Sequence, residues 1–328
     1  MKLSIIIPVY NVEKYVGATL QSILDQRQDV LDYEVIIVDD GTADNSMQVV
    51  ESYINKLPLT VIHQENKGLS GARNAGFRKA KGDYVWFVDS DDTLPPKSFE
   101  LVYKMLYKND AEIFTFGLFS VREGMDSLQP MQTIFTKTPE KYIGHIFSGK
   151  QLHGIIGTGL AQKNIFERTF LDKYNLSFLE GIYHEDMEFL ARAFFFAKRI
   201  YVTDTPLYIY LLRNSGSIMA TRNERHLASE IKIIESFVKF RNQFAKSSFE
   251  KSLINDRICS MALKLLSLDD SLVKGYSTYM ASRKREVRWI GIKAAISSLN
   301  IMTKGKMLRI NLLVFAPYLL PRIRKELN

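Results

Sequence analysis

Short apolar runs alternate with longer amphipathic stretches along the first 120 residues of the chain. The runs are rich in Ile, Val and Phe without polar alternation, which is typical of strands buried on both faces. They cover residues 3–9, 33–38, 59–64, 83–88 and 111–119, and the stretches between them, residues 12–26, 45–56, 69–81 and 97–109, have helical spacing. Helices between such strands make parallel crossover connections. The pattern therefore predicts an α/β fold with a doubly wound, mostly parallel sheet.

The second half of the chain is predicted to end in helices. Residues 181–200 open a helix with acidic residues in its first turn and continue with apolar residues at helical spacing. Residues 225–244, 254–268 and 286–299 also read as helices. We expect two domains: residues 1–215, with halves at 1–110 and 111–215, and a helical C-terminal region at 216–328.

The excess positive charge of the chain lies at its C-terminal end. Residues 283–328 hold eleven Lys and Arg against two acidic residues, a net charge of +9, so the total of +8 leaves −1 for residues 1–282. This distribution argues against a nucleic-acid surface on the main body and for an anionic partner at the C-terminal end.

An apolar stretch of 11 residues, 310–320, lies between Arg309 and Arg322 in this basic end. It is shorter than the roughly 20 apolar residues of a spanning helix, but it fits a segment that lies in a membrane interface with its bases on anionic headgroups. The alternative is a C-terminal helix packed on the body with a solvated basic end. The run at residues 3–9 is too short for a signal peptide and contains Pro8, so we expect a cytoplasmic protein, peripheral on the inner face of the cell membrane.

Polar and acidic residues follow each of the first four apolar runs. They are Tyr10 and Asn11, Asp39 and Asp40, residues 63–67, and residues 89–92. Because ligands of doubly wound sheets bind beyond the carboxyl ends of the strands, we expect the binding site there.

Three carboxylates, Asp89, Asp91 and Asp92, lie within four positions at the end of the run "YVWFV". Carboxylates packed this closely repel one another unless a cation or a hydrogen-bond network neutralises them. Mg²⁺ or Mn²⁺ fits such a group, because these ions take oxygen ligands and often bridge to substrate phosphates. The alternative is that Asp92 and Thr93 cap the helix expected from residues 95–106.

Other nucleotide sites fit less well. Residues 68–76, "GLSGARNAG", resemble a phosphate-binding glycine loop but lack the Lys-Ser/Thr ending, and no G-x-G-x-x-G follows the first run. The single cysteine, Cys259, excludes an intramolecular disulfide and is expected to be a core residue.

Five motifs in order resemble the family 2 glycosyltransferases with the GT-A fold. They are "SIIIPVYN", "VIIVDDGTADNS", "NKGLSGARNAG", "GDYVWFVDSDD" and "HEDMEF", and the resemblance covers residues 1 to about 215. It implies that residues 1–110 bind the nucleotide of a UDP-sugar and that residues 111–215 form the acceptor half. The Q-x-x-R-W motif of the processive synthases is absent from the sequence.

The resemblance also implies roles for individual residues of the donor site. The tyrosine of the first motif packs on the base, the acidic pair contacts uracil and ribose, the arginine lies beside them, and the D-x-D motif contacts ribose, metal and diphosphate. The donor residues are then Pro8, Tyr10, Asp39, Asp40, Arg73, Asp89, Ser90, Arg213 and Ser217, and the metal ligand is Asp91.

Several of these residues have a simpler alternative role. Tyr10 can merely cover a strand end, and Arg73 can be a surface residue on the helix face of Arg78 and Lys79. Arg213 and Ser217 lie in "YIYLLRNSGSIM", which resembles a segment that closes over the diphosphate but equally fits an edge strand followed by a solvent loop.

The aspartate of the E-D pair is the general base in the family, which implies this role for Asp186. The alternative is that Glu185 and Asp186 only stabilise the helix dipole. A single base implies one displacement with inversion at the anomeric carbon, and a metal offsets the charge on the leaving UDP.

We therefore expect a non-processive hexosyl- or N-acetylhexosaminyltransferase of cell-surface or exopolysaccharide assembly. Its acceptor is expected to be a lipid-linked glycan, because of the resemblance together with the basic tail. The alternative is a catalytically inactive nucleotide-sugar-binding or membrane-tethering protein.

Overall fold

The computed structural model describes residues 2–27, 29–124, 138–155, 159–214, 223–266, 268, 273 and 276–296. The chain forms two compact units. Unit 1 comprises Met1–Gly181 and Glu185–Ser217, and unit 2 comprises Ile182–His184 and Ile218–Asn328. The basic tail, residues 304–328, and Ser217 lie outside the described residues.

The described part of unit 1 contains an eight-stranded sheet with the order β3-β2-β1-β4-β7-β5-β8-β6. Strands β6 and β7 run opposite to the other six. The strands are β1 (Lys2–Val9), β2 (Asp32–Asp39), β3 (Leu59–His63), β4 (Tyr84–Phe87), β5 (Ile113–Arg122), β6 (His145–Phe147), β7 (Asn164–Glu167) and β8 (Ile200–Leu212).

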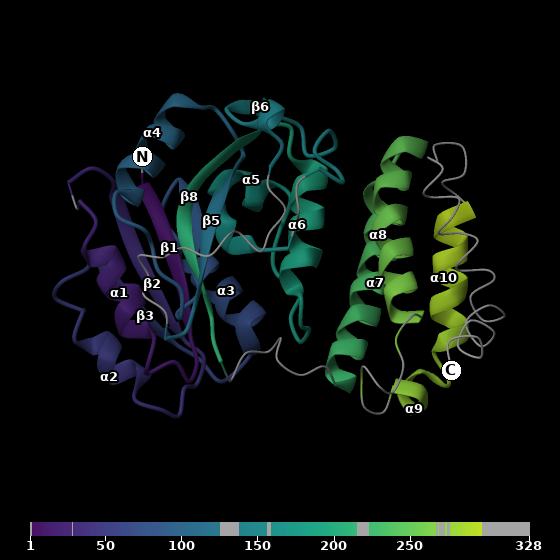
Figure 1. The fold of residues 1–328 in the computed structure, drawn as a ribbon, viewed down its shortest axis with the longest axis horizontal. Coiled ribbons are helices and arrows are strands. Elements are labelled where there is room, and N and C mark those ends of the chain that lie inside the picture. Colours follow the sequence, from purple (N-terminus) through teal and green to yellow (C-terminus); the bar gives the residue numbers. More distant parts are fainter. Residues whose placement is uncertain are drawn as a thin grey trace. The chain divides into compact units, whose positions relative to one another are not determined.

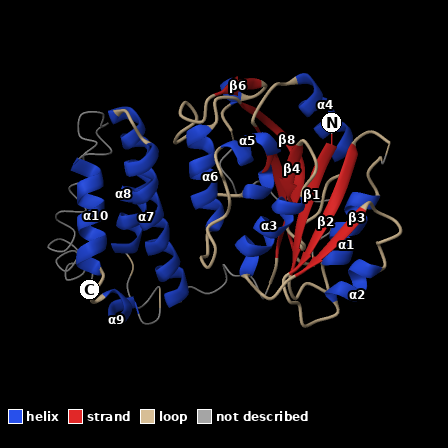
Figure 2. Cartoon of the chain, turned by 180° about the vertical axis from the view of Figure 1, so that it is seen from behind, coloured by secondary structure: helices blue, strands red, loops and turns tan. Residues whose placement is uncertain are grey.

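Helices cover both faces of this sheet, because its strands carry apolar side chains on both sides (Figures 1 and 2). In β1, Ile5 and Ile7 belong to one buried cluster and Ile6 to the other. The first cluster includes α1 (Val16–Leu24), α2 (Ser46–Glu51) and α4 (Ser98–Lys108), and the second includes α3 (Gly68–Lys79), α5 (Arg168–Lys173) and α6 (Glu185–Phe196). The predicted α/β, mostly parallel sheet is confirmed.

The register of the parallel strands brings several loops to one edge of the sheet. Val9 pairs with Asp39, and Asp39 pairs with His63, so the residues that follow leave the sheet side by side. The loop after β4 joins them and forms a bridge to β8, where Thr93 and Ile209 exchange both backbone hydrogen bonds at 2.8 and 3.1 Å. The long strand β8 therefore carries its C-terminal residues to the expected site.

The described part of unit 2 is helical, with α7 (Glu224–Phe244), α8 (Ser248–Leu266), α9 (Tyr276–Met280) and α10 (Lys284–Ile296). Asn223 caps α7, because its side chain accepts from the backbone N–H of Arg225 at 3.0 Å. Cys259 is buried on α8, as predicted. None of the described helices has both the length and the apolar character needed to cross a membrane.

Gly76 is required where α3 packs on the sheet. A Cβ atom at this position would lie 2.3 Å from Cγ2 of Ile6 and 3.2 Å from Cγ2 of Val38. We expect Gly76→Ala to lower the free energy of unfolding by about 1–3 kcal/mol despite the better helix propensity of alanine. Thermal unfolding measures this, at roughly 2–4 °C of Tm per kcal/mol for a unit of this size.

The matched control is Gly17→Ala in α1. Its Cβ would lie 3.3 Å from a single side-chain methyl, Cγ1 of Val49, so we expect a change of less than about 1 kcal/mol. A Gly76→Ala variant that is as stable as this control would show that α3 does not pack on β1 at the described distance.

Candidate active site

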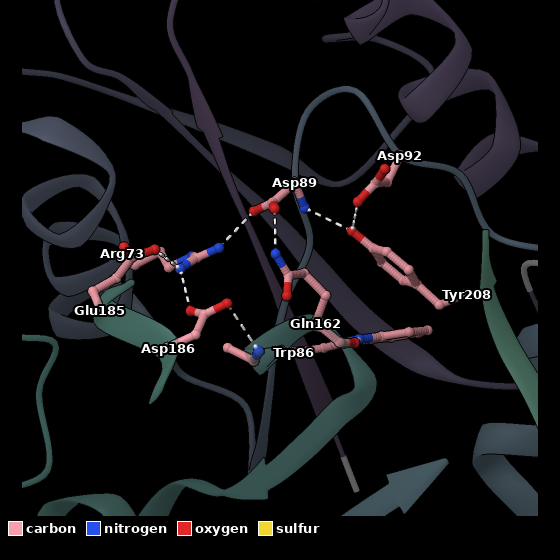
Figure 3. Close-up of polar contacts among 9 residues, drawn as sticks. Arg73, Trp86, Asp89, Asp92, Gln162, Glu185, Asp186 and Tyr208 are labelled. Carbon is pink, nitrogen blue, oxygen red and sulfur yellow. Dashed lines mark hydrogen bonds and ion pairs between the residues drawn. The ribbon is translucent and has the colours of Figure 1, made fainter. Parts of the chain in front are cut away.

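Arg73 is the centre of a buried ion-pair network (Figure 3). Its side chain comes from α3 and is fully buried, so it is not the surface residue that the alternative reading required. One terminal nitrogen donates to Asp89 Oδ1 at 2.7 Å. The other donates to Glu185 Oε1 at 2.8 Å and to Asp186 Oδ1 at 2.7 Å. One guanidinium thus joins the D-x-D motif to the acidic pair at the start of α6.

The network changes the proton affinity of its members. Burial disfavours the charged form of Arg73, but the carboxylates of Asp186, Asp89 and Glu185 outweigh it and raise the pKa of the guanidinium. Burial raises the pKa of Glu185 to about 7, and the neighbouring Asp186 charge acts in the same direction. Burial also raises the pKa of Asp186, against the opposing effect of Arg73. A carboxylate with a raised pKa is a stronger base than an exposed aspartate.

Asp89 is held from three sides. Besides the bond from Arg73, its Oδ2 accepts from Nε2 of Gln162, and its backbone N–H donates to the hydroxyl of Tyr208 at 3.0 Å. The backbone carbonyl of Gln162 in turn accepts from Nε1 of the buried Trp86 at 2.7 Å. Asp89 is therefore fixed in orientation by residues of three separate stretches of the chain.

Asp92 does not cap a helix. The following helix, α4, begins only at Ser98, with Lys97 at its N-cap position. Asp92 instead turns into the protein, where its Oδ2 accepts from the hydroxyl of Tyr208 at 2.6 Å and its Oδ1 from the backbone N–H of Leu211 at 2.7 Å. Burial and the charges of its neighbours in the motif raise the pKa of Asp92. The third carboxylate thus attaches the motif to β8.

Asp91 points to a different partner, the loop after β8. Its Oδ2 pairs with Nε of Arg213 at 2.9 Å. The guanidinium of Arg213 also lies over the ring of Tyr15, 5.4 Å from its centroid, and the Tyr15 hydroxyl donates to Glu123 at 2.8 Å. Glu123 accepts from the backbone N–H of Asn214 at 2.9 Å. These contacts place Arg213 directly beside the D-x-D motif.

The donor set fits a divalent cation at Asp91. One oxygen each of Asp89, Asp91 and Asp92 lie within 4.8 Å of one another. Asp89 and Asp92 have both oxygens bound by protein donors, whereas Asp91 pairs with a cation that lies on a loop. Burial, followed by the charge of Asp89, raises the pKa of Asp91 to about 6, so positive charge beside it is favourable. Mg²⁺ and Mn²⁺ commonly use one or two carboxylates together with substrate phosphates.

The expected nucleotide residues lie at the ends of β1 and β2. Tyr10 is 48% exposed, so its ring is accessible for stacking. Asp40 is buried, and its Oδ1 accepts from Nε2 of Gln64 at 2.6 Å and from the backbone N–H of Lys67 at 2.8 Å. Asp39 Oδ2 lies 2.9 Å from Nδ1 of His63. These two carboxylates therefore join the loops that follow β2 and β3.

Two other predicted donor residues, Pro8 and Ser90, are buried and help to position the polypeptide backbone around the site. Pro8 is buried in β1, beyond Ile6, the last residue of that strand to pair with β4. Ser90 is buried, and its carbonyl accepts from the hydroxyl of Thr19 at 2.9 Å. The structure brings Arg73, Asp89 and Asp186 into direct contact, and Tyr10, Asp39 and Asp40 belong to the neighbouring loops of the same edge.

The sequence analysis missed two residues that hold the carboxylates. They are Gln162 and Tyr208, which contact Asp89 from positions 73 and 119 residues away. Neither lies in one of the five motifs, although Tyr208 opens the stretch "YIYLLRNSGSIM". Alternation of aromatic and aliphatic residues there indicates a strand but not which side chains face the site.

The chain is similar to known proteins in sequence and in fold. Residues 4–170 match the family model described as glycosyl transferase family 2. The uncharacterized glycosyltransferase EpsJ of Bacillus subtilis is 31% identical over 270 residues, which are 80% of this chain and 76% of the relative. The putative glycosyltransferase EpsH of the same organism is 34% identical over 246 residues, 72% of this chain and 68% of the relative. The poly(ribitol-phosphate) beta-N-acetylglucosaminyltransferase TarS of Staphylococcus aureus is 31% identical over 225 residues, 67% of this chain and 37% of the relative.

Solved structures share the fold at lower identity. TarS residues 1–349 of S. aureus in complex with UDP-GlcNAc superpose with a TM-score of 0.66 at 22% identity, covering 97% of this chain and 87% of that chain. A mannosyltransferase from Pyrobaculum calidifontis in complex with GDP-Man and Mn²⁺ gives a TM-score of 0.51 at 14% identity, with 97% and 79% covered. The family match and the curated relatives establish that this chain is a glycosyltransferase of family 2, and its sheet is that of the GT-A fold.

Proposed function

We propose that the chain transfers a hexose or N-acetylhexosamine from a UDP-sugar to a hydroxyl group of a glycan acceptor, with inversion and with the help of a divalent metal. The observation that carries the proposal is the contact of Arg73 with both Asp89 and Asp186. It puts the carboxylate assigned to the donor and the carboxylate assigned to the acceptor on one cation. The complex of TarS with UDP-GlcNAc supports the choice of donor.

Asp186 is the general base of the proposed reaction. Its carboxylate takes the proton of the acceptor hydroxyl, whose oxygen attacks the anomeric carbon while the bond from that carbon to the diphosphate oxygen breaks. One displacement inverts the configuration. Arg73 and the backbone N–H of Ala161, 3.2 Å from Oδ2, hold the carboxylate in place. The buried position of Asp186 raises its pKa.

The donor is held by the residues at the ends of the strands. We assign the face of the uracil to Tyr10, polar contacts of uracil and ribose to Asp40 and Asp39, and the diphosphate to Arg213 together with Ser217. The motif's Asp89 faces the ribose. Mn²⁺ or Mg²⁺ bound at Asp91 supplies positive charge that offsets the charge developing on the leaving UDP.

The acceptor is proposed to be a glycan on a lipid carrier, in cell-surface or exopolysaccharide assembly at the inner face of the membrane. TarS and a Bacillus spizizenii relative are named for transfer to poly(ribitol-phosphate). The net charge of +9 in residues 283–328 supports an anionic membrane as the surface where acceptor and enzyme meet. Trp289 on α10, within this basic region, is 54% exposed.

Binding of UDP is expected to require both a metal ion and Asp91. Calorimetric titration of UDP is expected to give micromolar binding with Mn²⁺, and binding at least about tenfold weaker with EDTA or in Asp91→Asn, because the diphosphate then loses its cation. Asp172→Asn, a surface carboxylate of the same unit, is the matched control and is expected to bind as the wild type does. Metal-independent binding, or a preference for GDP over UDP, would contradict the proposed donor site.

Asp186→Asn is expected to lower turnover about 10²- to 10⁴-fold while UDP still binds, because only the base is lost. Slow hydrolysis of UDP-GlcNAc or UDP-glucose, with water as the acceptor, provides an assay that needs no known glycan. A hydrolysis rate of Asp186→Asn close to that of the wild type would show that Asp186 is not the base. Wild-type protein that binds UDP tightly but turns over no UDP-sugar, with or without glycan acceptors, would favour an inactive nucleotide-sugar-binding protein.

The pH profile of the same reaction has an expected sign. The active form of Asp186 is the carboxylate, so activity is present above its pKa and is lost as pH falls through it. The ordinary pKa of an aspartate is about 3.9. Because burial raises the pKa of Asp186, we expect the acid limb of the activity profile to lie above pH 4. Glu185, with a pKa of about 7, shares Arg73 with Asp186, so the limb belongs to the pair. A limb at or below pH 4 would contradict the buried position of the base.

Membrane binding is expected to depend on anionic lipid and on the tail. The chain should co-sediment with phosphatidylglycerol vesicles at least about tenfold better than with phosphatidylcholine vesicles, and added salt should weaken the binding. Of the two tryptophans, Trp86 is fully buried and Trp289 is exposed, so a blue shift of emission on binding reports Trp289. Deletion of residues 304–328 should reduce vesicle binding and leave UDP binding intact. Equal binding to both lipids would contradict an electrostatic contact.

A further inference from the structure

Two adjacent residues contact both of the carboxylates on which the proposed reaction depends. The backbone N–H of Ala161 donates to Asp186 Oδ2 at 3.2 Å. The side-chain amide of the next residue, Gln162, donates to Asp89 Oδ2. Figure 3 shows Gln162 next to Asp89, on the side of Asp89 away from Arg73. The two carboxylates are thus joined twice, through the guanidinium and through this short segment.

The orientation of the Gln162 amide follows from chemistry. Its nitrogen must face Asp89, because the carbonyl oxygen of the amide would repel a carboxylate oxygen. The other end of the amide is less favourable: Oε1 is buried and has no hydrogen-bond partner among the described residues. The whole residue is 3% exposed. A buried carbonyl without a partner destabilises the folded state, so an apolar side chain of the same size would suit the packing better.

The backbone of Gln162 is also fixed. Its carbonyl accepts from Nε1 of Trp86, which is fully buried in β4, the strand that leads into Asp89. The side chain therefore reaches Asp89 from a segment anchored to the same strand. Such an arrangement restricts where the Asp89 carboxylate can lie relative to the base, because neither end of the connection can shift alone.

We propose that Gln162 is a positioning residue of the transfer reaction, which orients Asp89 for the donor and, with Ala161, sets the spacing between Asp89 and the base Asp186. This inference rests on the proposed function, since it assigns the donor to Asp89 and the base to Asp186. Gln162 acts through these carboxylates. The unpaired Oε1 lowers the stability of the folded protein. The hydrogen bond to Asp89 explains why a glutamine at this position is still useful for function.

Two variants of similar size separate this role from space filling. Gln162→Met keeps the volume and removes the N–H donor, and Gln162→Glu keeps the shape but directs a second acceptor at Asp89. Gln162→Met is expected to lower UDP affinity, measured with Mn²⁺, and the rate of UDP-GlcNAc hydrolysis, with kcat/KM reduced about 10- to 100-fold. Its Tm should stay within about 3 °C of the wild type, because the unpaired carbonyl is removed as well.

The order of the two variants is part of the test. A positioning role predicts that Gln162→Glu is the more damaging of the two, because repulsion replaces a hydrogen bond. A space-filling role predicts the opposite, because Gln162→Glu is the closer match in shape. Asn164→Asp is the control: Asn164 is buried two residues further on, and its amide nitrogen donates to the carbonyl of Leu160 at 2.8 Å, away from the site carboxylates. It is expected to lower Tm while the folded protein keeps wild-type UDP affinity.

A double-mutant cycle with Asp89→Ala tests whether Gln162 acts through Asp89. In the Asp89→Ala background, Gln162→Met should change UDP affinity by less than about twofold, because the group it orients is absent. Losses that simply add in the double variant would overturn the proposal, as would a folded Gln162→Met variant with wild-type UDP affinity and turnover.

The same measurements distinguish failure of this inference from failure of the proposed function. Asp186→Asn should lower turnover alone, whereas Gln162→Met should lower both turnover and UDP affinity. If the wild type does not bind UDP, the proposed function fails. Thermal unfolding of the four proteins of the cycle still tests whether Gln162 interacts with Asp89. A coupling energy between the two positions supports this interaction, and the absence of coupling overturns it.

Discussion

The site depends on the charge balance around Arg73. This guanidinium is fully buried, and the carboxylates that surround it come from the end of β4 and the start of α6. Removing the cation would leave buried carboxylates without a counter-charge, which is far more destabilising than the pair is stabilising. The position of α6, and with it that of Asp186, is therefore tied to the first half of the sheet. Other residues of the site refine an arrangement that this cation makes possible.

The D-x-D segment divides its three carboxylates among three directions. Asp89 turns to Arg73, Asp92 turns into the protein and holds Tyr208 and the backbone of β8, and Asp91 faces Arg213 on the following loop. The charge density that the sequence shows at this point is thus separated by structure: two of the carboxylates are used to fix the segment. This division leaves Asp91 as the carboxylate of the segment that the proposed metal and diphosphate would use.

The sequence predicts those parts of the site that lie in continuous motifs. Short buried runs and the polar residues after them are local signals, so the sheet, Asp89, Asp91 and Asp186 were predictable, and the family motif pointed to Arg73. The antiparallel insertion of β7 between β4 and β5 was not predictable. The four residues "NIFE" carry no pattern that shows whether the strand lies at an edge of the sheet, which strands it pairs with, or in which direction it runs. Gln162 escaped for the same reason. The role of Gln162 depends on its contact with Asp89, 73 residues away in the sequence. The local pattern also gave a wrong interpretation of Asp92, as the cap of the following helix.

The same cation also links the two halves of the proposed reaction. With Asp89, Glu185 and Asp186 ionised and Arg73 charged, the cluster has a formal charge of −3 + 1 = −2. Burial raises the pKa of both Glu185 and Asp186, so the pair takes up a proton more readily than exposed acids do, and one bound proton reduces the formal charge to −1. A less negative cluster repels the diphosphate of the proposed donor less. The same burial therefore acts on both acids of the motif: it strengthens the proposed base and lets the pair lose negative charge, and because both acids share Arg73 the protonation of one depends on that of the other.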